Sequence, residues 1–175
     1  MKRHIYVISV ALIALSTVAL AQSDGQKSFD TLKGLAGSWQ GRITTVPPAP
    51  EMDGKQMQVS LRVTSMGNAL MHEMTAPGRP DDPITMLYMD GDHLMLTHYC
   101  DAGNRPRMEG KMLPDGKTVE FDFLDVAGST KYGHMHHAVF TIVDASHHTE
   151  DWTFMVEGKQ GPMPVKAHVD LYKQN

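Results

Sequence analysis

The chain has 175 residues, of which 41% are hydrophobic and 21% charged, a balance typical of one globular domain and too apolar for a disordered chain. Its 16 Lys and Arg residues are outnumbered by 20 Asp and Glu residues. Such a chain lacks the basic surface that nucleic-acid binding requires, so we expect no nucleic-acid partner. A single cysteine, Cys100, excludes an intramolecular disulfide and any multi-cysteine zinc or iron–sulfur site.

The first residues have the organisation of a cleaved secretory signal. Two basic residues are followed by an apolar run over 5–20, and Ala19-Leu20-Ala21 forms the small-x-small pattern that signal peptidase reads. The run is shorter than the roughly 20 apolar residues that span a membrane, and no cysteine follows it to carry a lipid. We therefore expect a signal peptide over 1–21, one mature domain over 22–175, a periplasmic or secreted location and no stable membrane anchor.

One short helix and about ten strands are predicted after the signal. The helix is expected over 28–36, because apolar residues recur there at three- and four-residue spacing between Ser28 as N-cap and Gly37 as stop. Beyond it, short apolar or alternating runs are interrupted by Gly, Pro, Asp and Asn, which is typical of strands and tight turns. The expected strands lie near 38–46, 56–65, 69–75, 84–90, 93–100, 106–113, 118–125, 134–143, 148–157 and 164–172.

Strands joined mostly by hairpins predict an all-β fold. A sheet of about ten strands has two edges to hide, and an antiparallel up-and-down barrel removes both while it encloses a cavity. A β-sandwich is the alternative, and the lack of long crossover connections disfavours it. We expect the short N-terminal helix to plug or flank one mouth of the barrel.

The junction between helix and first strand carries a family resemblance. Residues 35–41, Leu-Ala-Gly-Ser-Trp-Gln-Gly, resemble the Gly-x-Trp signature on the first strand of lipocalins and other calycin barrels. The resemblance implies that Trp39 closes the bottom of the barrel and that the interior holds small apolar molecules. The mature chain is also similar to exported bacterial lipocalin-like domains of unknown function. Three segments carry this narrower match: Leu96-Thr97-His98-Tyr99-Cys100, Asn104-Arg105-Pro106-Arg107 and Gly133-His134-Met135-His136.

Nitrobindin-like haem barrels are a more distant resemblance. They share the ten-strand plan and a Gly-Ser-Trp-Gln-Gly opening, which residues 37–41 match. The following Arg42-Ile43-Thr44-Thr45 lacks the Tyr-Pro-Thr-Ile-like continuation of that family, which argues against haem. The sequence therefore assigns no cofactor.

Alternation along a strand predicts which side chains face the cavity, because successive residues point to opposite faces. Over 84–90 both faces are apolar, and the choice stays open. Three other strands show a more apolar face that we expect inside: Met57, Val59, Leu61 and Val63; Leu94, Leu96, His98 and Cys100; Val119, Phe121 and Phe123.

The strand over 93–100 and the loop after it suggest a ligand-binding site. His98 and Cys100 share the expected inner face, and Arg105 and Arg107 follow near the mouth, where they could hold the polar end of an apolar ligand. Tyr88 on the preceding strand completes the expected ligand-binding set. The alternative is a structural network in which His98 bonds a carbonyl and the arginines cap loops.

A second candidate site is a metal site. His134 and His136 lie two apart on one strand, so their Cα atoms are about 6.5–7 Å apart on the same face. One zinc or copper ion could join them if a neighbouring strand supplies a third ligand. His148 and Glu150 share a face of the next strand, and whether that face is the same one depends on the turn between them. The alternative is a set of surface histidines.

The sequence favours a binding protein that holds a small, largely apolar molecule. The alternative is a metal- or haem-binding barrel that uses His134 and His136, and a metal-assisted hydrolase is less favoured. Motifs of serine hydrolases, zinc proteases and phosphate-binding loops are absent from the sequence. The Glu150-Asp151 pair is interpreted as part of a solvated face. We therefore expect no catalytic residue, and the oligomeric state stays open.

Overall fold

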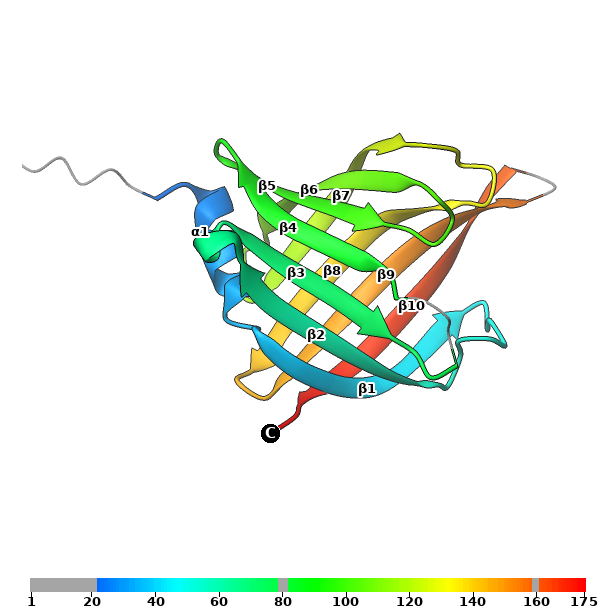
Figure 1. Cartoon of the computed structure of the whole chain (residues 1–175), viewed down its shortest axis with the longest axis horizontal. Helices are drawn as coiled ribbons and strands as arrows, with labels where there is room; N and C mark the ends of the chain where they lie inside the picture. The colour runs from blue at the N-terminus through cyan, green and yellow to red at the C-terminus, as the bar shows by residue number, and fades with distance from the viewer. Residues whose placement is uncertain (1–21, 79–81, 159–160) are drawn as a thin grey trace, which may run out of the picture.

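Ten antiparallel strands close into a barrel in the computed structural model (Figure 1), which describes residues 22–78, 82–158 and 161–175. Neighbours follow the chain order, and β1 pairs with β10 to close the ring. Strands hold 63% of the described residues, which confirms the all-β barrel. The expected signal peptide lies outside the described residues. The elements are α1 (Asp24–Lys33), β1 (Gly37–Val46), β2 (Gln56–Thr64), β3 (Ala69–Thr75), β4 (Ile84–Asp90), β5 (His93–Tyr99), β6 (Arg105–Met112), β7 (Thr118–Ala127), β8 (His134–Asp144), β9 (His147–Gly158) and β10 (Gly161–Lys173).

The helix begins four residues earlier than expected. Ser23, not Ser28, is the N-cap, and its side chain accepts a hydrogen bond from the backbone N–H of Gln26 at 3.2 Å. Ser28 lies inside α1, buried, and donates its hydroxyl to the carbonyl of Asp24. A cap followed directly by an acidic first turn outweighs the apolar spacing as a start signal. No helix in the described ranges is long and apolar enough to cross a membrane.

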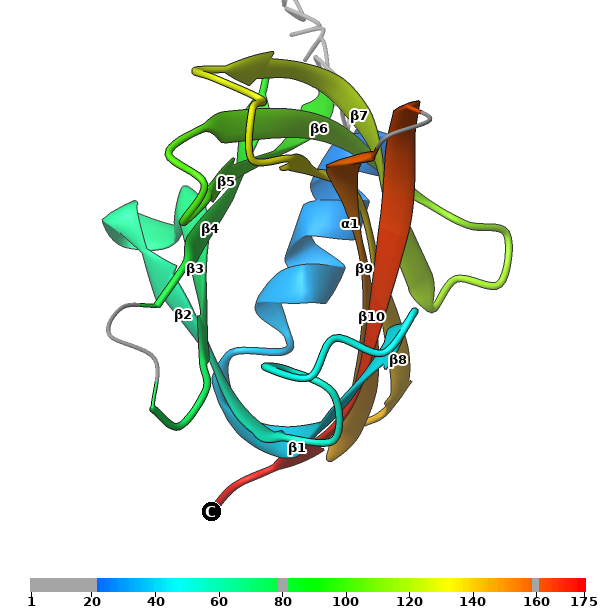
Figure 2. The same cartoon turned by 90° about the vertical axis from the view of Figure 1, so that its right-hand side faces the viewer.

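Helix α1 closes one end of the barrel. Figure 2 looks along the barrel from the opposite end, with α1 behind the ring of strands. Phe29 and Leu32 of the helix are 2% and 0% exposed. Trp39, 1% exposed, donates its indole N–H to the carbonyl of Leu35 at 2.8 Å. The tryptophan is therefore buried at the closed end, as expected.

The interior follows the expected alternation on most strands. Met57, Val59 and Leu61 are each at most 2% exposed. Val63 differs, at 39% exposed, because β2 ends at Thr64 and leaves this residue at the rim. On β4 the sequence left open which face points inward. The structure buries the face that carries Thr85 and Leu87, both less than 2% exposed.

Strand β10 begins at Gly161, three residues before the expected start, and includes Pro162 and Pro164. The expected strand over 164–172 already included Pro164, and the three added residues include Pro162, which cannot donate to a ladder. The partner β1 ends at Val46, opposite Lys166. The first residues of β10 therefore pair with β9 alone, and an edge tolerates proline.

Candidate functional site

The barrel encloses a cavity of about 360 Å³ at the end opposite α1, at the small end of the range for ligand pockets. Loop residues between β1 and β2, β3 and β4, and β5 and β6 line its mouth. Most of its wall is apolar: Ile43, Met52, Met74, Met135, Trp152, Phe154, Val156, Val165 and Ala167. Polar side chains are few: Thr45, Glu51, His72, Thr85, His98 and Asp101.

The loop between β1 and β2 lies across the mouth in Figure 2. Several hydrogen bonds fasten it. The backbone N–H of Thr45 donates to Asp53 Oδ1 at 2.7 Å, and Thr45 Oγ1 accepts from the backbone N–H of Ala49 at 2.7 Å. These bonds hold Ala49 and Met52 against the cavity.

A buried carboxylate lies behind the residues that form the floor of the cavity. Glu150 of β9 is fully buried and accepts three N–H donors. Its Oε2 accepts from His72 Nε2 at 2.9 Å and from Trp152 Nε1 at 3.0 Å, and its Oε1 accepts from His148 Nε2 at 3.1 Å. His72 and Trp152 also line the cavity, so this network joins the ligand space to the core.

Burial alone would raise the pKa of Glu150, because a carboxylate loses its hydration there. The hydrogen bonds and charges of His72 and His148 outweigh that effect and lower the pKa below its ordinary value. Glu150 is therefore an ionised group inside the barrel. The interpretation of Glu150-Asp151 as a solvated face was wrong for Glu150, since its side chain points inward opposite Phe140.

His98 lines the cavity, as expected. It is 5% exposed, and its Nδ1 lies 2.8 Å from Thr85 Oγ1 on the neighbouring strand. Burial lowers the pKa of His98 to about 4, and the charge of His72 contributes in the same direction. The ring is therefore neutral at pH 7, and it can donate or accept a hydrogen bond without bringing a charge.

The other expected ligand-binding residues lie in different parts of the barrel. Cys100 lines the cavity near its mouth. Arg105 instead borders a depression on the outer wall, together with Tyr99 and Asn104. Arg107 is on the outside, where it donates to Asp125 from two guanidinium nitrogens. Tyr88 alternates with the buried Leu87, and its hydroxyl lies 3.1 Å from Thr97 Oγ1 on the outer face.

His134 and His136 lie together, but away from the Glu150 network. A register shift in β8 between Met135 and His137 places Met135 at the cavity wall. The two histidines are joined by a hydrogen bond, His134 Nε2 to His136 Nδ1, at 3.2 Å. The ring of Phe123 stacks on His136 with a centroid distance of 4.5 Å. Their side chains fill the space where β7 and β8 part, since the pairing of these strands ends at Asp122 and His137.

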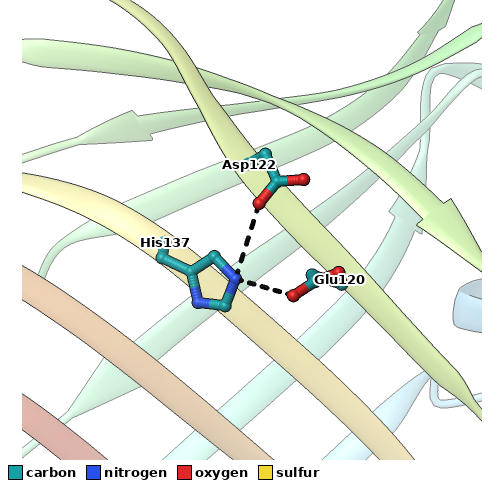
Figure 3. A group of neighbouring side chains, drawn as sticks. All are labelled: Glu120, Asp122 and His137. Carbon is teal, nitrogen blue, oxygen red and sulfur yellow. Dashed lines mark hydrogen bonds and ion pairs between the residues drawn. The ribbon is translucent and has the colours of Figure 1, made fainter. Parts of the chain in front are cut away.

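One trio of potential metal ligands occurs in the described part of the chain, and it does not include these two histidines. Glu120, Asp122 and His137 bring one ligand atom each within 4.8 Å of one another (Figure 3). They lie on the outer face, and Lys111 Nζ is 2.8 Å from Asp122 and 3.4 Å from Glu120. The ammonium group of Lys111 therefore already pairs with these carboxylates. We interpret the group as an ion-pair network across β6, β7 and β8.

Sequence reasoning missed His72 and Trp152 as site residues. On β3, His72 shares a face with Leu70 and Met74 and stands opposite Leu61, which faces inward. That alternation was the available signal. The contact between His72 and Glu150 had no local signal, because 78 residues separate them along the chain.

Neither a protein-family model nor a curated protein matches this sequence. Solved structures share the fold. Rv2717c from M. tuberculosis is 14% identical, with a TM-score of 0.59 over 85% of this chain and 98% of that one. A DUF3598-family protein of unknown function from Nostoc punctiforme PCC 73102 is 14% identical, with a TM-score of 0.56 over 82% of this chain. The alignment covers 49% of that protein, so this chain spans about half its length. These similarities show the barrel fold alone.

Proposed function

We propose that the protein is a lipocalin-like binding protein, exported to the periplasm or secreted, that holds a small, largely apolar molecule in the barrel. The cavity itself carries this proposal. Its wall combines aromatic rings and flexible methionines with a few polar groups, which is the usual composition of a ligand pocket. One end is closed by α1, so the ligand enters past the loop between β1 and β2.

A neutral fluorescent probe tests the proposal. N-phenyl-1-naphthylamine should bind the wild-type protein saturably with one site. Ala167→Phe places a ring in the cavity, since Ala167 lines it, and should weaken probe binding at least about tenfold. Lys166→Phe, the adjacent exposed position on β10, is the matched control and should bind like the wild type. Equal binding by both variants would place the probe elsewhere and contradict the proposal.

Native mass spectrometry of protein purified without chelator separates the proposal from the metal alternative. A retained organic molecule supports the binding protein. Stoichiometric zinc or copper that is lost in His134→Phe/His136→Phe would favour the metal-binding alternative. Retained haem would favour a haem-binding barrel.

A further inference from the structure

The hydrogen bond between Thr85 and His98 determines which nitrogen of His98 carries the proton. Both side chains are buried, and His98 Nδ1 is the hydrogen-bond partner of the Thr85 hydroxyl among the described residues. A buried hydroxyl donates where an acceptor is present, so Thr85 donates to Nδ1. The neutral ring then carries its proton on Nε2. His98 therefore offers one N–H donor at the cavity wall.

His72 offers a second polar atom at the cavity wall. Its Nε2 donates to Glu150 at 2.9 Å, so Nδ1 is the ring nitrogen that remains for a ligand. Nδ1 is buried and has no hydrogen-bond partner within the described ranges. His72 is 2% exposed and lines the cavity. A buried polar atom without a partner destabilises the protein unless a ligand or water forms a hydrogen bond with it.

Both histidines lie against Trp152. The ring centroid of Trp152 is 5.5 Å from that of His72 and 5.9 Å from that of His98. The Glu150 carboxylate lies directly behind His72, and the described lining residues include acidic side chains but neither Lys nor Arg. An anionic ligand head would therefore bring a second negative charge close to Glu150, and no Lys or Arg among the described lining residues would pair with it. A hydroxyl avoids this cost, because it is neutral and both donates and accepts.

Resting on the proposed function, we propose that the bound molecule is a small apolar alcohol or phenol, whose hydroxyl accepts from His98 Nε2 and forms a second hydrogen bond with His72 Nδ1. Trp152 and Phe154 pack against its apolar body, and the methionines of the wall adjust to its shape.

Three matched probes test the head group: 4-hexylphenol, hexylbenzene and 4-hexylbenzoate, titrated calorimetrically into the mature protein at pH 7. After correction for partition between water and octanol, 4-hexylphenol should bind at least about tenfold more tightly than hexylbenzene. The benzoate should bind most weakly. Equal affinities for the phenol and hexylbenzene would overturn the hydroxyl assignment and leave the proposed function standing, as would tightest binding of the benzoate. Binding of none of the three would contradict the proposed function itself.

Thr85→Val tests the role of the Thr85 hydroxyl. Valine keeps the shape of threonine but cannot donate, so His98 loses its fixed proton position. The affinity for 4-hexylphenol should fall about tenfold while that for hexylbenzene stays unchanged. Thr97→Val is the matched control, because Thr97 contacts Tyr88 on the outer face, and it should change neither affinity. His98→Phe, which keeps a ring in place, should lose the same preference for the phenol. Preservation of that preference in both Thr85→Val and His98→Phe would overturn the inference.

Discussion

Glu150 lies fully buried with three N–H donors around its carboxylate, so its replacement changes more than one interaction. In Glu150→Gln the amide nitrogen cannot accept, and at least one of the three donors is left without an acceptor. We expect the free energy of unfolding in urea to fall by about 3 kcal/mol or more.

Asp151→Asn is the matched control for that experiment. Asp151 is the next residue on β9, points outward, and pairs with His168 at 2.8 Å with both side chains about half exposed. Its loss should change the free energy of unfolding by no more than about 0.5 kcal/mol. Similar losses in the two variants would mean that the buried network contributes no more than a surface ion pair.

His98 makes stability depend on pH in a defined window. Burial lowers its pKa from 6.5 to about 4, so between these values the unfolded chain binds a proton that the folded protein does not. Stability therefore rises as pH increases from about 4 to 6.5, and this contribution is fully present above 6.5. Its full size is on the order of 3 kcal/mol.

His98→Gln removes this contribution, because glutamine does not titrate. Urea unfolding followed from pH 4 to 7 should show a flatter pH dependence for His98→Gln than for the wild type. Glu150 acts in the same direction at lower pH, since its lowered pKa makes stability fall when it is protonated. The difference between the two proteins isolates His98, and parallel curves would contradict the assigned pKa direction.

At the scale of elements, α1 closes one end of the barrel, and its buried face determines how much it contributes to the free energy of unfolding. Leu32 is 0% exposed, and Leu32→Ala should lower the free energy of unfolding by about 2–5 kcal/mol. Lys27→Ala removes an exposed side chain from the same helix, whose ion pair with Asp24 is largely solvated, and should cost less than about 0.5 kcal/mol. Thermal and urea unfolding measure both. A loss in Leu32→Ala as small as that in Lys27→Ala would show that the helix is not part of the cooperative core.

The strand pattern could be predicted because each strand carries a local signal, alternating side chains bounded by turn residues. Asp90-Gly91 and Asp115-Gly116 are such turns, and Gly91 and Gly116 have positive φ. The helix start and the start of β10 were misplaced because competing local signals had similar strength. The site was harder to predict. The facing of His98 followed from one strand, whereas the meeting of His72, Glu150 and Trp152 depends on barrel closure, which no local pattern encodes.

At the scale of the whole molecule, export stays a prediction, because the expected signal peptide lies outside the described residues. The mature protein should begin at Gln22 and occur in the cell-envelope or secreted fraction, because of the basic start, apolar run and small-x-small pattern that precede it. Intact mass and N-terminal sequencing of the native protein measure this. An intact N-terminus starting at Met1 on the native protein would contradict it.

Both ends of the described chain lie beside the plugged end of the barrel. Helix α1 leads directly into β1, and near the C-terminus Lys173 pairs with Trp39 while the backbone N–H of Gln174 donates to the carbonyl of Ser38 (Figure 1). The opening to the cavity is at the far end. A tether or fusion partner attached at either terminus therefore holds the barrel with its opening directed outward. Immobilised by its terminus on a sensor surface, the protein should keep the same probe affinity as in free solution.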